Sequence, residues 1–139
     1  MSYLNGQIIV VDGDKDTSAL IKVFLESQGY TVATASPEEK AIDSIPANDI
    51  ALYIINEKYP DSFTTELCRK IRAVDYVAPI LICSPSDHQS YIEKVRQAGA
   101  NDYITTPQDW IKLIDRMRSL IDHYLRDERS DKAMTEATA

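Results

Sequence analysis

Hydrophobic positions along this chain form five short, nearly continuous runs, with amphipathic stretches between them. Short apolar runs that end at Gly, Pro, Asn or Asp are typical of strands buried on both faces of a sheet. The pattern therefore predicts strands at residues 8–11, 30–35, 50–55, 79–83 and 102–105. Because helical stretches separate these runs, we expect parallel strands joined by helical crossovers.

The stretches between the strands carry apolar residues at helical spacing. Leu20, Val23 and Phe24 recur at that spacing and predict a first helix, which begins at Thr17 or Ser18. Further helices are expected from Pro37, at about residues 64–72, at 91–98, and from about Gln108 to Arg126. The last of them carries an apolar stripe made of Ile111, Ile114, Met117, Ile121 and Tyr124. Strands that alternate with helices in this way predict an α/β fold, (βα)5, with helices on both faces of a parallel sheet.

Length and composition add limits to this picture. The chain has 139 residues, which suits one domain, expected at residues 1–126, followed by a polar and disordered tail at 127–139. Fifteen Lys and Arg against 22 Asp and Glu give a net charge of −7, which argues against direct contact with nucleic acid or a membrane surface. The sequence has no apolar run long enough for a membrane span and no signal-peptide pattern at its start, so a cytoplasmic location is expected. Its two cysteines, Cys68 and Cys83, do not make a disulfide framework or a zinc site.

Candidate chemistry lies just after the apolar runs, because ligands of open parallel sheets bind at the carboxyl ends of the strands. Asp12, Gly13 and Asp14 follow the first run and Asn56 follows the third. Ser84 ends the fourth, and Thr106 follows the fifth with Pro107 after it. We expect these residues to gather at one edge of the sheet.

From about Gln7 to Leu125, this constellation resembles the receiver domain of two-component response regulators. The resemblance is carried by five segments in order: Val10–Asp14, Asn56 with Pro60, Glu66–Arg72, Pro79–Ser84 and Ala98–Pro107. The last is the most specific, because the family reads Ala-Gly-Ala-x-Asp-Tyr-ϕ-x-Lys-Pro there. The resemblance implies a flavodoxin-like sheet with strand order 2-1-3-4-5.

The chain departs from the family at three positions that would do chemistry. A working receiver takes a phosphoryl group onto an aspartate after the third strand, and here that position is Asn56, a neutral and poor nucleophile. Two acids after the first strand help to bind Mg²⁺ in the family, and the second of them is Gly13 here. A lysine after the fifth strand neutralises the phosphoryl oxygens, and Thr106 replaces it. The chain is therefore interpreted as a degenerate pseudo-receiver.

Three positions retain the family's pattern. Asp12 remains, but one carboxylate is expected to hold Mg²⁺ weakly if at all, so neither a metal nor a cofactor is predicted. Asp14 lies further along the loop, where a solvated turn and helix cap are the simpler interpretation. In a working receiver, a Ser or Thr after the fourth strand forms a new hydrogen bond once the phosphoryl group is present. Ser84 is either this retained switch hydroxyl or a turn residue. Tyr103 stands at the aromatic switch position, where an inward ring would resemble the activated state and an outward ring the resting state.

The favoured function is a phosphorylation-independent module of two-component or phosphorelay signalling, which has no enzymatic activity and acts on a protein partner. In the family, the fourth helix, fifth strand and fifth helix often form the partner or dimer surface. Candidate interface charges there alternate in sign: Lys94, Asp102, Lys112, Asp115, Arg116 and Arg118. They suit a homodimer or a partner surface, and a solvated face with pairs within the helix is the alternative.

Two other functions are kept as alternatives. The vacated pocket of a receiver-like sensor would bind a small ligand instead of phosphate. Less favoured is a metal-dependent phosphohydrolase of the haloacid-dehalogenase kind, because the stretch from Asp12 to Thr17 resembles its Asp-x-Asp-x-Thr motif with Asp12 or Asp14 as nucleophile. That family also needs a downstream lysine and an acidic pair.

Overall fold

The computed structural model describes residues 6–36, 50–60, 62–75 and 77–123. Five strands lie in these ranges: β1 (Gln7–Asp12), β2 (Val32–Ala35), β3 (Ile50–Asn56), β4 (Ile80–Ser84) and β5 (Asp102–Thr105). The helices are α1 (Lys15–Ser27), α2 (Ser62–Val74) and α3 (Gln89–Gln97), followed by a 3₁₀ turn (Trp110–Lys112) and a helix at residues 113–123. None of these helices combines the length and the hydropathy needed to cross a membrane.

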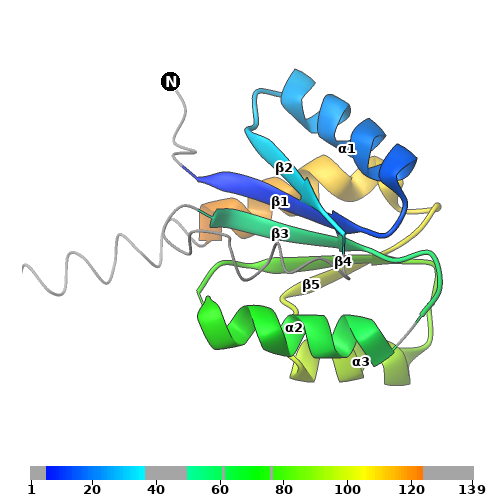
Figure 1. Ribbon diagram of the computed structural model, residues 1–139. Coiled ribbons are helices and arrows are strands. Elements are labelled where there is room, and N and C mark those ends of the chain that lie inside the picture. The colour runs from blue at the N-terminus through cyan, green and yellow to red at the C-terminus, as the bar shows by residue number, and fades with distance from the viewer. Residues whose placement is uncertain (1–5, 37–49, 61, 76, 124–139) are drawn as a thin grey trace, which may run out of the picture.

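The strands form one parallel sheet in the order β2-β1-β3-β4-β5, as the sequence and the family resemblance predict (Figure 1). Helices cover both faces of the sheet: α2 and α3 lie below it in Figure 1, and α1 and the last helix lie on the opposite side. Four helices fall within the described ranges, whereas the expected short helix from Pro37 lies outside them. The expected tail at 127–139 lies outside them as well.

Alternating side chains of the strands build one hydrophobic core on each face of the sheet. In β1, Ile9 and Val11 pack in the core under α2 and α3, while Ile8 and Val10 pack in the core under α1 and the last helix. Burial on both faces explains why β1, β3 and β4 read as continuous apolar runs and not as alternating ones.

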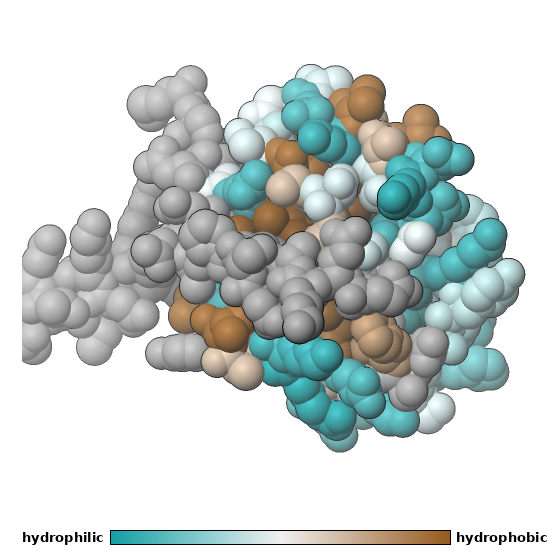
Figure 2. All heavy atoms as spheres, viewed as in Figure 1, coloured by the Kyte–Doolittle hydropathy of each residue, from teal (hydrophilic) through white to brown (hydrophobic). Residues whose placement is uncertain are grey.

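Helix α1 is confirmed, but its buried face differs from the one that the pattern suggests. The helix begins at Lys15, and its buried apolar residues are Ile21 and Leu25. Leu20 is 72% exposed and Val23 66% exposed, and hydrophobic side chains are visible on the surface over α1 (Figure 2). Both sets of residues satisfy a spacing of three or four positions, so periodicity alone does not choose between two neighbouring stripes of the same helix.

The last helix begins later than the sequence predicts. Gln108 lies in a turn, and the chain passes through a 3₁₀ segment before the α-helix starts at Leu113. A 3₁₀ turn has about 3.0 residues instead of 3.6, which shifts the phase of the stripe. Ile111 is therefore 88% exposed, although the stripe predicted it to be inward, whereas Met117 and Ile121 are buried as expected. Tyr124 lies outside the described residues.

Candidate functional site

The carboxyl ends of the parallel strands bring the predicted polar residues to one edge of the sheet. Asp12 at the end of β1 is the register partner of Asn56 at the end of β3. Ser84 at the end of β4 pairs with Thr105 of β5, directly before Thr106. Residues that are far apart in sequence thus meet because every strand runs in the same direction.

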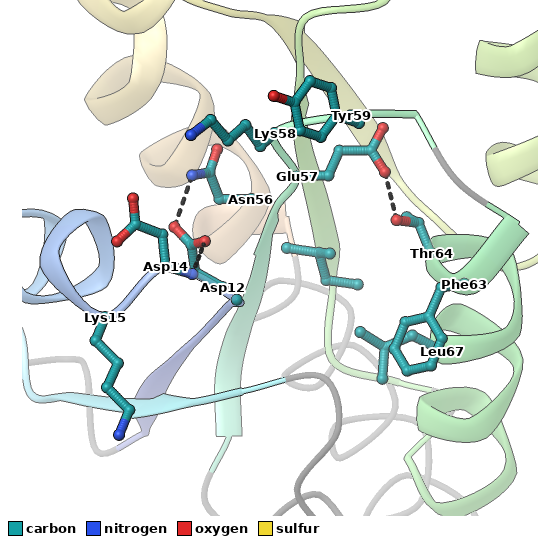
Figure 3. A pocket seen from close by; sticks show the side chains of 12 residues that line it. Asp12, Asp14, Lys15, Asn56, Glu57, Lys58, Tyr59, Phe63, Thr64 and Leu67 are labelled. Carbon is teal, nitrogen blue, oxygen red and sulfur yellow. Dashed lines mark hydrogen bonds between the residues drawn. The ribbon is translucent and has the colours of Figure 1, made fainter.

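Asp12 and Asn56 are hydrogen-bonded to each other at the centre of this edge. Asn56 Nδ2 donates to Asp12 Oδ2 at 2.7 Å, and the backbone N–H of Asp14 donates to Asp12 Oδ1 at 2.9 Å (Figure 3). An ionised carboxylate only accepts hydrogen bonds, so this contact directs the amide nitrogen of Asn56 toward Asp12. Asp12 is also 6% exposed, and each of its oxygens already has a donor from the chain.

Asp14 caps helix α1 beside Asp12. Its Oδ1 accepts from the backbone N–H of Asp16 at 3.0 Å and its Oδ2 from Thr17 Oγ1 at 2.9 Å. The hydrogen bond from Thr17, and then that from Asp16, lower the pKa of Asp14 below its ordinary value. This arrangement agrees with the turn and helix-cap interpretation of Asp14.

A divalent cation needs several oxygen ligands, and three residues at this edge bear on whether it would find them. Gly13 contributes no carboxylate, Asn56 presents its nitrogen to Asp12, and both Asp12 oxygens have donors. Within the described ranges, no group of three or more His, Cys, Asp or Glu side chains is placed to hold a metal ion. Packing does not impose the glycine, because a Cβ built at Gly13 would meet nothing within 4 Å.

An open cavity of about 590 Å³ lies beside Asp12 and Asn56. Lys58 lies at its rim and Phe63 and Leu67 form an apolar wall on α2 (Figure 3). A second cavity of about 320 Å³ shares the acidic edge and reaches Pro85, Thr106 and Trp110. Sequence reasoning did not single out Lys58, which follows Asn56 by only two positions and lines both cavities.

Thr106 stands where the resemblance to the receiver family leads us to expect a lysine. It is 7% exposed, and its backbone N–H donates to the carbonyl oxygen of Ser84 at 2.8 Å. The Thr106–Pro107 peptide is cis. Thr106 also lines the smaller cavity, where its hydroxyl brings no positive charge to the edge of the sheet.

The most connected side chain at this edge is Glu57, which sequence reasoning missed. Ser84 Oγ donates to Glu57 Oε2 at 2.5 Å, and the Tyr91 hydroxyl lies 2.7 Å from each carboxylate oxygen. Thr64 Oγ1 also donates to Oε1 (Figure 3). One signal in the sequence could have found Glu57: it is an acid that directly follows Asn56 at the end of the most apolar strand. A charged side chain next to a buried strand needs hydrogen-bond partners.

Tyr103 lies inward. It is 9% exposed, its hydroxyl donates to the carbonyl oxygen of Ser86 at 2.6 Å, and burial raises the pKa of its phenol. Its ring meets that of Tyr91 edge to face, with centroids 6.4 Å apart and planes at 78°. Ser84, Tyr91 and Tyr103 therefore belong to one packed group.

A family model described as the response regulator receiver domain matches residues 8–118. The chain belongs to this family. The receiver domain is 27% identical over 123 residues to the regulatory protein VanR of Enterococcus faecium, covering 87% of this chain and 52% of that protein. It is 31% identical over 106 residues to the alkaline phosphatase synthesis transcriptional regulatory protein PhoP of Bacillus subtilis, covering 75% and 43%. The receiver domain thus spans about half the length of the curated relatives it matches.

Solved structures agree with the fold of this receiver. A two-component response regulator from Clostridium difficile is 28% identical with a TM-score of 0.73, covering 84% of this chain and 96% of that one. A CheY-like receiver domain protein from Methanospirillum hungatei has a TM-score of 0.74 at 23% identity, covering 88% and 98%, and shows the same fold.

The receiver's predicted interface charges are partly paired within the chain. Arg116 Nη1 lies 3.0 Å from Asp102 Oδ2 and 3.1 Å from Oδ1, so a charge of β5 is joined to the last helix. Lys112 pairs with Asp109 at 3.4 Å. Pairs this exposed contribute about 0–1 kcal/mol. The other three candidates are exposed: Lys94, Asp115 and Arg118.

The remaining titratable candidates of the receiver occupy ordinary positions. Cys68 and Cys83 are fully buried, and burial raises the pKa of the Cys68 thiol to about 11 and raises that of Cys83 as well. His88 is exposed at the start of α3 and His123 is exposed on the last helix. The two thiols pack as hydrophobic side chains.

Proposed function

We propose that this receiver domain is a pseudo-receiver, which signals through protein contact and does not accept a phosphoryl group. The hydrogen bond from Asn56 Nδ2 to Asp12 Oδ2 carries the proposal. A carboxamide lacks the anionic oxygen that attacks phosphorus, so Asn56 has no acyl phosphate to form. Nδ2 of Asn56 also donates a hydrogen bond to Oδ2 of Asp12, so that this oxygen is not free to bind a metal ion.

The other two replaced positions support the same function. Gly13 lacks a carboxylate although a Cβ built there would meet nothing within 4 Å. Thr106 is neutral and buried, so it does not balance the charge of a phosphoryl group. A site without metal or phosphate has no need of the lysine, and the three replacements are therefore mutually consistent.

The pseudo-receiver is proposed to act on a protein partner of a two-component pathway in the cytoplasm, without enzymatic activity of its own. We place the partner or homodimer contact on the surface formed by α3, β5 and the last helix, where Lys94, Asp115 and Arg118 are exposed. The net charge of −7 favours a protein partner over nucleic acid or lipid for direct contact.

The decisive test titrates the protein with beryllofluoride or acetyl phosphate in the presence of Mg²⁺ and records backbone amide shifts. No saturable change is expected at Asp12, Asn56 or Ser84. Saturable changes clustered at these residues would contradict the proposal.

A matched pair of variants shows that the assay detects a working site. The triple variant should bind beryllofluoride, because it restores the acid pair, the acceptor and the cation. It combines Gly13→Asp, Asn56→Asp and Thr106→Lys. Asn56→Asp alone should bind at least about tenfold more weakly, which corresponds to ~1.4 kcal/mol of lost interaction. Equal binding by both variants would show that Gly13 and Thr106 do not matter.

A small-ligand sensor is the second candidate, and the cavity of about 590 Å³ beside Asn56 favours it. Its lining combines the apolar wall of Phe63 and Leu67 with the charged groups of Asp14 and Lys58. A thermal-shift screen with nucleotides and amino acids tests this function, because a ligand at 100 times its dissociation constant adds about 2.7 kcal/mol of stability. The phosphohydrolase alternative gains no support, since Asp14 caps α1 and Asp12 holds Asn56.

A further inference from the structure

One carboxylate joins four elements of the fold at the edge of the sheet. Glu57 directly follows β3, and its hydroxyl donors are Ser84 at the end of β4, Thr64 in α2 and Tyr91 in α3. These four residues are called the Glu57 cluster below. Ser84 and Thr64 are 0% and 4% exposed, so the carboxylate meets them on the protein side of the cavity.

The contacts of Glu57 are with hydroxyl groups and not with a basic side chain. In the described ranges, the ion pairs are Lys112–Asp109 and Arg116–Asp102, and neither contains Glu57. Hydrogen bonds to a charged acceptor are about twice as strong as neutral ones, and each hydroxyl is directed by the anion it meets. One carboxylate thus connects side chains of three other elements at the end of β3.

The Glu57 cluster continues into the segment between β4 and α3 and closes on itself. Ser84 Oγ, which donates to Glu57, accepts the backbone N–H of Ser86 at 3.3 Å. The carbonyl oxygen of Ser86 accepts a hydrogen bond from the hydroxyl of Tyr103 at 2.6 Å. The ring of Tyr103 is in an edge-to-face contact with the ring of Tyr91. Tyr91 donates back to Glu57. The inward Tyr103 and the segment after β4 therefore belong to one closed series of contacts that begins and ends at Glu57.

We propose that Glu57 is a built-in anion that engages Ser84 permanently and holds the surface of α3 and β5 in the conformation with Tyr103 inward. This inference rests on the proposed pseudo-receiver function, and it names the group that sets the conformation of such a domain. Because Glu57 supplies the anion that Ser84 contacts, the conformation of the surface offered to a partner does not require a phosphoryl group.

Glu57→Gln tests the inference, because it keeps the shape of the side chain and replaces one acceptor oxygen by a donor. Glu66→Gln is the matched control, since Glu66 is exposed on α2. In the full chain, without Mg²⁺ or phosphate, Glu57→Gln should speed hydrogen exchange of the Ser86 amide by about tenfold and shift the ring signals of Tyr91 and Tyr103. The control should change neither. Shifts confined to residues 56–58 in Glu57→Gln would overturn the inference.

Two milder variants keep the test decisive if Glu57→Gln does not fold. Tyr91→Phe removes one donor and keeps the ring, and should speed Ser86 exchange by about two- to fivefold. Thr64→Val added to Tyr91→Phe should have less than a multiplicative effect, because both remove a hydroxyl donor from the same carboxylate. Independent, multiplicative effects would assign the residues separate structural roles and would overturn the inference.

The same spectra separate failure of this inference from failure of the proposed function. Beryllofluoride with Mg²⁺ is titrated into the wild-type protein. A saturable response at Asn56 would contradict the pseudo-receiver function and this inference with it. A silent wild type, together with unchanged Ser86 exchange in Glu57→Gln, would overturn this inference alone.

Discussion

The two ends of the sheet each contain a charged side chain that collects several hydrogen bonds, but the partners differ in kind. At the amino ends of β4 and β5, Arg72 Nη1 donates to the carbonyl oxygen of Ala78 at 2.6 Å and Nη2 to that of Gly99 at 2.8 Å. Arg72 also donates to the carbonyl oxygen of Asp75 and to Asn101 Oδ1. At the carboxyl ends, the Glu57 carboxylate accepts hydrogen bonds from the side-chain hydroxyls of Thr64, Ser84 and Tyr91.

This difference separates a structural connection from an adjustable one. A carbonyl oxygen is held by the backbone, so the contacts of Arg72 with Asp75, Ala78 and Gly99 change when the α2–β4 or the α3–β5 connection itself moves. A hydroxyl turns about a single bond, so the Glu57 contacts can rearrange while the fold stays intact. We therefore expect substitutions at the Arg72 end to act on stability and those at the Glu57 end to act chiefly on local conformation.

The largest effect is expected for Arg72→Ala. It leaves the carbonyl oxygens of Ala78 and Gly99 without their donor, and the free energy of unfolding should fall by about 3 kcal/mol. Urea denaturation measures the loss. Arg69→Ala, an exposed position of the same helix, should change stability by less than about 0.5 kcal/mol. A loss of the same small size in both variants would show that Arg72 is not the structural connection.

Gly99→Ala should be the next most damaging change. Gly99 has a φ of +126°, and a Cβ there would lie 2.6 Å from Arg72 Cγ. Gly29, with a φ of +94°, would meet nothing within 4 Å. Backbone strain alone costs each alanine variant about 1–2 kcal/mol, and we expect Gly99→Ala to cost about 1 kcal/mol more in thermal unfolding. In an Arg72→Ala background that excess should vanish, and its persistence would contradict the clash as the cause.

Removing one tyrosine hydroxyl at each end compares the two networks directly. Tyr53 donates to buried Asp75 at 3.1 Å, and Tyr53→Phe should lower the free energy of unfolding by about 1–2 kcal/mol. Tyr91→Phe should lower it by about 0.5–1 kcal/mol, because Glu57 keeps two other donors and faces the cavity. Chemical denaturation of both variants decides the order, and the reverse order would break the proposed contrast.

The smallest effect is the pH dependence of the α1 cap. Hydrogen bonds lower the pKa of folded Asp14 below its ordinary 3.8, so its carboxylate contributes stability that is fully present above that value. The contribution is lost as the pH falls through the lowered pKa. Stability of wild type relative to Asp14→Asn, measured from neutral pH down to acid pH, should therefore decrease over that range. Asp16→Asn controls for the loss of a negative charge in the same helical turn, and an identical profile in both variants would contradict the cap.

Much of the fold could be predicted from local pattern. The three central strands β1, β3 and β4 stand out because they are buried on both faces. Asp12, Asn56, Ser84 and Thr106 could be placed together because parallel strands end at one edge. Local pattern was insufficient where two solutions fit equally well. Ile21 and Leu20 begin overlapping stripes of α1, and contact with the sheet selects Ile21. The phase at Ile111 depends on a 3₁₀ turn that the apolar spacing does not reveal.

The sequence by itself determined the family, the parallel sheet and the presence of Gly13, Asn56 and Thr106 at the edge of that sheet, because these depend on the order of the apolar runs and on the residue types that follow them. The tertiary structure alone decided what the remaining polar groups do. The hydroxyl partners of Glu57 lie 7, 27 and 34 positions away along the chain, and no periodicity links them. Only the packing of α2 and α3 against the ends of β3 and β4 brings Thr64, Ser84 and Tyr91 to one carboxylate.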